Sequence, residues 1–304
     1  MRTAVTVGGL SYSYGRRGFR LEVDRLEAMA GEVTALIGPN GAGKTTLLQL
    51  LSGLVPPHAG DIRVGGLSQF QARRAGRLAV FLDRFPPDSA LPFDTWLLAV
   101  ASQRGLSWKR ADAEDWASRC GVNDLLGKRL GAMSAGQRRR AGLALATIGE
   151  WDVLLLDEPL ASLDPPAAMT WRETFVRYAA EGKVVLISSH ALAELERIGH
   201  RFVFLRDGRI VRVAGREDLE NSERIQVVAR ASLAEVLEAL SGAVVLAEAE
   251  EDGRAAVEVS AASVGGMTGL LPRLSSAGLP IVSVAEGQRS LEELFREVVD
   301  DAHE

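Results

Sequence analysis

The segment at residues 38–46 reads Gly-Pro-Asn-Gly-Ala-Gly-Lys-Thr-Thr and fits the pattern G-x-x-x-x-G-K-[ST]. The mostly apolar residues 32–37 before it are typical of a strand, and the leucine spacing over 47–54 indicates one face of a helix. Glycines let backbone N–H groups approach a phosphate, and the helix directs its positive end towards the same anion. A helix dipole contributes only ~0.3–1 kcal/mol. Lys44 must therefore supply a full charge, and Thr45 an oxygen ligand for Mg²⁺.

A pair of carboxylates provides the second chemical signal. The apolar residues 153–156 end in Asp157 and Glu158. Beside a phosphate loop, Asp157 is expected to orient Mg²⁺, and Glu158 to polarise an attacking water as a general base. The alternative is a strand that merely stops in a charged turn, and the presence of Lys44 and Thr45 disfavours it.

Composition excludes several other classes of protein. The 304 residues are 47% hydrophobic and 25% charged, so the chain is expected to bury a large core. The net charge of −5 disfavours a nucleic-acid partner, and the single cysteine, Cys120, suits a reducing cytosol and is expected to be packed and inert. No apolar run reaches the ~18 residues that cross a bilayer, so another chain is expected to provide any membrane passage. The histidines at 58, 200 and 303 lack the spacing of a zinc site.

Short apolar runs predict an α/β sheet over the first part of the chain, with strands near residues 4–7, 19–23, 32–37, 153–156, 184–188, 202–205 and 209–213. Asp207 and Gly208 between the last two runs indicate a hairpin. Residues 85–150 show helical periodicity and predict a helical insert. The basic residues 138–140 are expected on a solvated helix face and an interface.

The last part of the chain, residues 216–304, shows a different pattern of short apolar runs. Its runs predict the order βαββαβα, with strands near 225–229, 243–246, 256–259 and 281–284 and helices near 233–240, 265–274 and 291–299. The first six elements match a small ferredoxin-like α+β domain. We therefore predict two domains, a phosphate-loop domain over 1–215 and an accessory domain over 216–304.

A third motif, Met133-Ser134-Ala135-Gly136-Gln137, precedes the acidic strand and opens an apolar helix. It resembles Leu-Ser-Gly-Gly-Gln, the signature of the ATP-binding subunits of ABC transporters, with Ser134, Gly136 and Gln137 kept and two positions changed. The resemblance covers roughly residues 1–215 and implies a P-loop NTPase core of the ABC ATPase type that uses ATP and Mg²⁺. The end of the chain, residues 290–295, also resembles the C-terminal extension of bacterial exporter-type subunits.

The resemblance also implies roles for individual residues. Tyr14 resembles the aromatic that stacks on adenine, with Tyr12 as a rival, and His190 resembles the histidine that contacts the γ-phosphate alongside Glu158 and Lys44. Thr45 and Asp157 are the implied metal ligands, and in the family the signature closes over the nucleotide of the other subunit. The nucleotide-contacting positions carried over are Tyr14, Gly38, Pro39, Asn40, Gly41, Ala42, Gly43, Lys44, Thr45, Thr46, Asp83, Ser134, Gly136, Gln137 and Asp164.

One family position is changed. Where the family has a glutamine that touches Mg²⁺ and water, the best register places Asp83, and a shift of one residue places Arg84. Asp83 could still offer an oxygen to Mg²⁺, but it is a methylene shorter than glutamine and adds negative charge. The change bears on hydrolysis and coupling and leaves ATP binding by Lys44 and Thr45 intact.

The expected function is therefore Mg·ATP hydrolysis that drives transport through separate transmembrane permease subunits. Such a chain works at the cytoplasmic face of the membrane, as a homodimer or as a heterodimer with a related subunit. Asp83 motivates an alternative, a non-hydrolysing regulatory partner in a heterodimer. A soluble non-transport ABC ATPase acting on nucleic acid or ribosomes is a further alternative, which the acidic charge and the single nucleotide motif disfavour.

Overall fold

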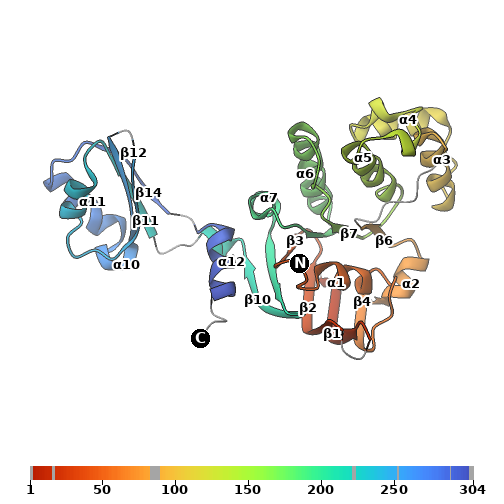
Figure 1. Cartoon of the computed structure of the whole chain (residues 1–304), viewed down its shortest axis with the longest axis horizontal. Coiled ribbons are helices and arrows are strands. Elements are labelled where there is room, and N and C mark those ends of the chain that lie inside the picture. The colour runs from red at the N-terminus through yellow and green to blue at the C-terminus, as the bar shows by residue number, and fades with distance from the viewer. Residues whose placement is uncertain are drawn as a thin grey trace. The chain divides into compact units, whose positions relative to one another are not determined.

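The computed structural model describes residues 3–15, 18–82, 90–220, 224–251, 253–287 and 289–300. The chain divides into two compact units, the first from Met1–Ala214 with Phe295–Glu304 and the second from Gly215–Leu294 (Figure 1). The two domains predicted from the sequence, 1–215 and 216–304, stay a prediction. The two units differ from them by assigning Phe295–Glu304 to the first unit and Gly215 to the second. None of the helices in the described ranges is long and apolar enough to span a bilayer.

The first unit is built on a mixed sheet, which has ten strands among the described residues, in the order β5-β4-β1-β2-β10-β9-β3-β8-β7-β6. Its bounds are β1 (Thr3–Ser13), β2 (Arg20–Met29), β3 (Val33–Ile37), β4 (Ala59–Val64), β5 (Leu67–Ser68), β6 (Leu78–Phe81), β7 (Val153–Asp157), β8 (Val184–Ser188), β9 (Arg201–Arg206) and β10 (Arg209–Gly215). Strands β3, β7 and β8 are buried along their whole length, as parallel strands covered on both faces should be. These features confirm the predicted α/β core.

Helices cover this sheet and form the insert. They are α1 (Lys44–Leu51), α2 (Gln69–Arg74), α3 (Phe93–Gln103), α4 (Arg110–Arg119), α5 (Ala135–Ala146), α6 (Pro165–Ala180), α7 (Leu192–Ile198) and α12 (Leu291–Asp300). From residue 90 to 150 the chain forms α3, α4, α5 and two short 3-10 turns, as the helical periodicity predicts. The predicted hairpin also forms, because Asp207 and Gly208 adopt φ of 48° and 76° between β9 and β10, as a tight two-residue turn requires.

The second unit has the predicted βαββαβ order. Its elements are α8 (Glu217–Glu220), β11 (Arg224–Ala229), α9 (Leu233–Ala239), β12 (Val245–Glu251), β13 (Arg254–Ser260), α10 (Ala261–Val264), α11 (Gly266–Ser276) and β14 (Ile281–Glu286). The strands pair antiparallel in the order β12-β13-β11-β14, which is the ferredoxin-like arrangement. Alternate residues such as Ile225, Val227 and Val257 are buried with Leu270 and Leu274 of α11. The unit therefore has its own core.

The sheet order decides where the functional residues meet. Strands β3, β8 and β7 are neighbours and run parallel, so their carboxyl ends lie at one edge. The loop at 38–43 follows β3, Asp157 ends β7 with Glu158 directly after it, and Ser188 ends β8. Ligands of open α/β sheets bind at such an edge.

Candidate functional site

The glycine loop after β3 has the backbone shape that its sequence predicts. Gly41 and Gly43 adopt φ of 85° and 107°, in a region that favours glycine, and Gly43 is the N-cap of α1. At Gly38 an added Cβ would lie 2.2 Å from the carbonyl oxygen of Leu205, so only glycine fits there. The loop therefore delivers Lys44 and Thr45 as the first residues of α1.

A cavity of about 350 Å³ opens over this loop. It brings together the predicted loop residues other than Gly38 and Pro39, the predicted aromatic and both predicted carboxylates. It is lined by Tyr14, Phe19, Asn40, Gly41, Ala42, Gly43, Lys44, Thr45, Thr46, Asp157 and Glu158. The set combines an aromatic wall, a glycine-rich floor, one cation and two carboxylates. Such a set suits a nucleotide with its phosphates on the loop and a divalent cation beside the carboxylates.

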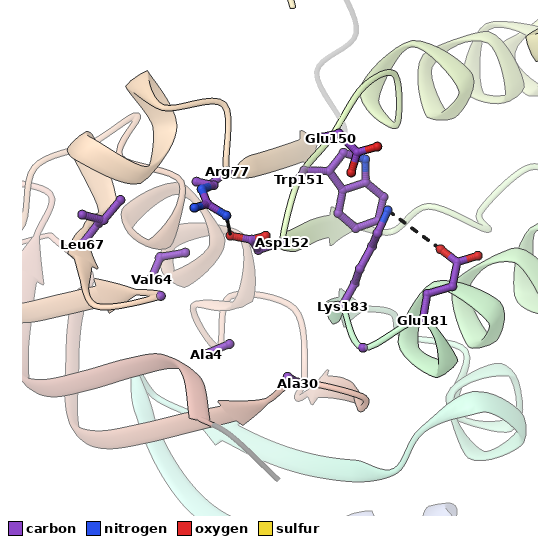
Figure 2. Close-up of a pocket in the computed structure, with 12 residues that line it drawn as sticks. Ala4, Ala30, Val64, Leu67, Arg77, Glu150, Trp151, Asp152, Glu181 and Lys183 are labelled. Atoms are coloured by element: carbon purple, nitrogen blue, oxygen red, sulfur yellow. Dashed lines mark hydrogen bonds and ion pairs between the residues drawn. The ribbon is translucent and has the colours of Figure 1, made fainter.

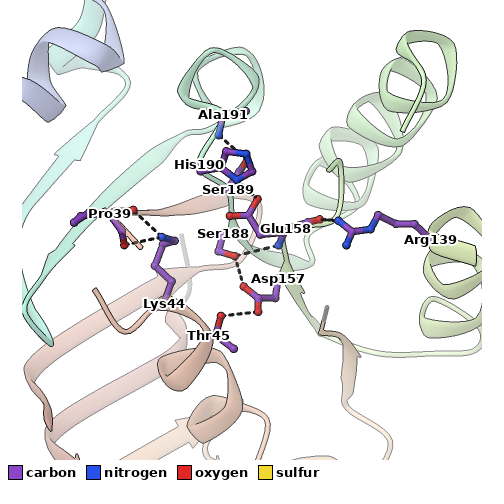
Figure 3. A network of polar contacts seen from close by, with 11 residues as sticks. Pro39, Lys44, Thr45, Arg139, Asp157, Glu158, Ser188, Ser189, His190 and Ala191 are labelled. Carbon is purple, nitrogen blue, oxygen red and sulfur yellow. Dashed lines mark hydrogen bonds and ion pairs between the residues drawn. The ribbon is translucent and has the colours of Figure 1, made fainter. Parts of the chain in front are cut away.

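Lys44 is held by the loop that it follows. Its Nζ donates to the carbonyl oxygens of Gly38 at 2.6 Å and Pro39 at 3.2 Å (Figure 3). The pKa of Lys44 is lowered, because burial outweighs the charges of Glu158 and Asp157, which act to raise it. The ammonium is thus placed in the loop by hydrogen bonds and faces two carboxylates.

Asp157 is fixed by hydroxyls on both of its oxygens. Thr45 Oγ1 donates to Asp157 Oδ2 at 2.7 Å, and Ser188 Oγ donates to Asp157 Oδ1 at 2.5 Å (Figure 3). Within the residues that the structure describes, no three side chains of His, Cys, Asp or Glu gather as a metal site. The Thr45 and Asp157 oxygens nevertheless fit Mg²⁺, which is held in nucleotide sites by one or two protein oxygens together with substrate phosphates.

Glu158 occupies a constrained position just after β7. Its φ of 48° lies in the left-handed region, and its N–H donates to the carbonyl oxygen of Ser188 at 3.1 Å and to Ser188 Oγ at 3.2 Å. Glu158 Oε2 lies 2.9 Å from His190 Nδ1, and Arg139 donates to the Glu158 carbonyl oxygen (Figure 3). Glu158 also lines an adjoining cavity of about 340 Å³ with His190. The predicted base and the predicted histidine are therefore in direct contact.

The geometry distinguishes the two candidate aromatics. Tyr14 lines the cavity, and its hydroxyl lies 3.4 Å from Thr46 Oγ1 and 3.3 Å from Gln49 Oε1. Tyr12 packs instead between the Tyr14 and His58 rings, with 5.0 Å between ring centroids in each pair, and against the core. The arrangement favours Tyr14 over Tyr12 for stacking on a base.

The signature residues lie apart from this cavity. Ser134 is the N-cap of α5: its hydroxyl accepts from the Gln137 N–H at 3.2 Å, and Gln137 Oε1 accepts from the Ser134 N–H at 3.1 Å. An added Cβ at Gly136 would lie 2.7 Å from the Ser162 carbonyl oxygen. Asp164 is the N-cap of α6, and its Oδ1 accepts from the Ala167 N–H at 2.8 Å. Asp83 and its alternative Arg84 lie outside the described residues.

Sequence reasoning missed two contributors to the site. Ser188 contacts both Asp157 and Glu158, and the sequence signal was a hydroxyl at the end of a buried strand, two residues before His190. Arg139 belongs to the run expected on a solvated helix face and an interface, and all three arginines of the run are half-buried. Arg139 reaches the Glu158 carbonyl oxygen, while Arg138 donates to the Met133 carbonyl oxygen at 2.6 Å and Arg140 donates to the Gly121 carbonyl oxygen. The run is therefore engaged within the fold, and no local sequence pattern indicated its partners.

A third cavity, of about 460 Å³, lies at the opposite, amino ends of β6, β7 and β8 (Figure 2). Its two basic residues are paired with carboxylates: Arg77 with Asp152 at 2.8 Å, and Lys183 with Glu181 at 3.9 Å. Lys183 also lies over the Trp151 ring, 4.1 Å from its centroid. Because both of its cations are already paired with carboxylates and it contains none of the predicted site residues, this cavity is not the nucleotide site.

Comparison with known proteins decides the family. The family model described as ABC transporter matches residues 21–161. The daunorubicin resistance ATP-binding protein DrrA3 of Streptomyces coeruleorubidus is 30% identical over 312 aligned residues, which cover 98% of this chain and 96% of the relative. The chain belongs to the ABC transporter family.

Other relatives of this ABC ATP-binding subunit agree. The Nod factor export ATP-binding protein I of Burkholderia lata is 34% identical over 68% of this chain and 70% of its own length. The lantibiotic transport ATP-binding protein SrtF of Streptococcus pyogenes is 29% identical over 72% of this chain and 94% of the relative. A solved ATP binding subunit of an ABC transporter superposes with a TM-score of 0.65 and 28% identity, covering 72% of this chain and 92% of that structure.

Proposed function

We propose that this ABC ATP-binding subunit hydrolyses Mg·ATP and thereby drives export through separate permease subunits. The observation that carries the proposal is the meeting of Lys44, Thr45, Asp157 and Glu158 around one cavity. The matched relatives are named for transport, export or drug resistance, which supports an exporter.

Each residue has a role that its contacts support. Lys44 and the glycine-loop N–H groups bind the phosphates, and Tyr14 stacks on the base. Mg²⁺ bound by Thr45 and Asp157 would neutralise charge on the phosphates. Glu158 accepts a proton from the attacking water, and His190 orients the Glu158 carboxylate through the 2.9 Å contact.

The partners follow from the same reasoning. Ser134, Gly136 and Gln137 do not line the cavity over the chain's own glycine loop, so we propose that they complete the site of a second subunit. That subunit is another copy of this chain or a related one. The pair then acts on permease subunits at the cytoplasmic face of the membrane.

The deciding experiment compares the purified chain with Glu158→Gln and a matched control. Glu158→Gln should keep ATP binding and slow Mg²⁺-dependent hydrolysis by about 10²–10⁴-fold, because the amide cannot act as a base. Glu114→Gln removes an exposed carboxylate from α4 and should leave both quantities unchanged. Equal turnover in all three proteins would remove Glu158 from its role. Nucleotide binding without hydrolysis in the wild type would support the regulatory alternative.

A further inference from the structure

We propose that Ser188 is a positioning residue that sets Asp157 and Glu158 in one geometry for hydrolysis. The proposal rests on the proposed ATPase function, and it concerns a residue outside the glycine loop, the carboxylate pair and the signature. Its basis is that one hydroxyl contacts both residues at the end of β7 (Figure 3).

The strand register brings Ser188 to this position. Strands β7 and β8 are parallel neighbours, and Asp157 pairs directly with Ser188 at their carboxyl ends. Ser188 is fully buried, and Asp157 is only 2% exposed. The hydroxyl therefore meets the carboxylate away from water, where a hydrogen bond to a charged group is strongest.

The hydroxyl uses its donor and its acceptor on different residues. Ser188 Oγ donates a hydrogen bond to Asp157 Oδ1 at 2.5 Å and accepts one from the Glu158 N–H at 3.2 Å. Thr45 holds the other oxygen of Asp157. An alanine at 188 can do neither, whereas its carbonyl oxygen would still accept the Glu158 N–H, as that of Ser188 does at 3.1 Å. Removing the hydroxyl should therefore loosen the site without breaking the fold.

The backbone of Glu158 explains why such support is needed. Its φ of 48° is disfavoured for a residue with a Cβ atom and persists only where neighbouring groups enforce it. In this conformation the Glu158 carboxylate lies against His190 and lines the cavity over the glycine loop. Ser188 thus acts on the reaction through Asp157 and Glu158 and does not line that cavity itself.

The test uses Ser188→Ala in the full chain, with Ser52→Ala as the matched control. Ser52 is equally buried, and its hydroxyl donates to the Gln49 carbonyl oxygen at 2.8 Å, so the control also deletes one buried hydroxyl. Ser188→Ala should lower kcat about tenfold, the equivalent of one hydrogen bond to a charged group, and change KM for ATP less than twofold. It should also raise by several-fold the Mg²⁺ concentration that half-saturates binding of a fluorescent ATP analogue. Ser52→Ala should lower the melting temperature comparably and leave kcat, KM and the Mg²⁺ requirement unchanged.

Combination with Glu158→Gln isolates the positioning role. At a Mg²⁺ concentration that saturates every variant, the effect through Asp157 is removed, so adding Ser188→Ala to Glu158→Gln should cost no further turnover. Independent multiplication of the two losses under these conditions would overturn the proposal. A Ser188→Ala protein that melts earlier but keeps wild-type kcat and Mg²⁺ requirement would also overturn it. If the wild type binds nucleotide without hydrolysing it, the proposal is tested by the Mg²⁺ requirement for nucleotide binding alone, compared between the wild type and Ser188→Ala. A wild type that binds no nucleotide would refute the proposed function itself.

Discussion

Cys120, the only cysteine of the chain, gives a direct handle on folding and ligand binding. It follows α4 and is 5% exposed. Burial raises the pKa of its thiol from the usual 9.0 to about 12, against the opposing charges of Arg119 and Arg177. Since the thiolate is the reactive form, alkylation at pH 8 should be about a thousandfold slower in the folded chain than in the unfolded chain, before any loss of access is counted.

The assay is pulse labelling with iodoacetamide followed by mass spectrometry, in which a single site gives a single mass shift. Labelling that requires unfolding should slow by about 100-fold when Mg·ATP is present at 100 times its Kd, because binding stabilises the folded state by about 2.7 kcal/mol. Lys44→Ala should abolish this protection. Labelling of the folded chain as fast as of the urea-unfolded chain would refute the burial argument. Undiminished ATP protection in Lys44→Ala would refute the role given to the glycine loop.

Two further predictions concern the loop and alkaline stability. Gly43→Ala should weaken ATP binding about tenfold or more, as measured with a fluorescent analogue. The reason is that the φ of Gly43 is 107° and the new Cβ would lie 2.8 Å from Phe19 Cζ and from Leu21 Cδ1. Unchanged affinity would contradict the loop geometry. The raised pKa of Cys120 means that the unfolded thiol ionises from pH 9 while the folded thiol stays protonated to about 12. The contribution of the Cys120 thiol to the free energy of unfolding is therefore complete below pH 9. Above pH 9 the free energy of unfolding, measured by urea titration, should fall by about 1.4 kcal/mol per pH unit, and Cys120→Ala should reduce this slope.

Local patterns in the sequence were enough to predict much of this architecture. The glycine loop, the carboxylate pair and the hairpin at Asp207 are short segments whose residue types impose one backbone shape or one chemistry. The βαββαβ order of the second unit followed in the same way from alternation and turn residues. In each case the deciding residues are neighbours along the chain.

What escaped prediction depends on contacts between distant segments. Ser188 acquires its role only because β8 pairs in register beside β7, and Arg139 only because α5 lies near the end of β7. Tyr12 and Tyr14 could not be separated because the end of β1 at Ser13 decides which ring packs and which lines the cavity. Strand order and strand ends are set by tertiary packing, which no local pattern contains.

The capping box at the start of α5 determines which hydrogen-bonding groups that end of the helix presents. Ser134 Oγ and Gln137 Oε1 act there as acceptors, each taking a hydrogen bond from a backbone N–H group. The Ser134 hydroxyl proton and the Gln137 NH₂ group are not used by those two bonds. Together with the N–H groups of the first helical turn that precede Gln137, they make the start of the helix a surface of donors. A chemical group that meets this surface must bring acceptors, and the oxygens of a phosphate do so from every side.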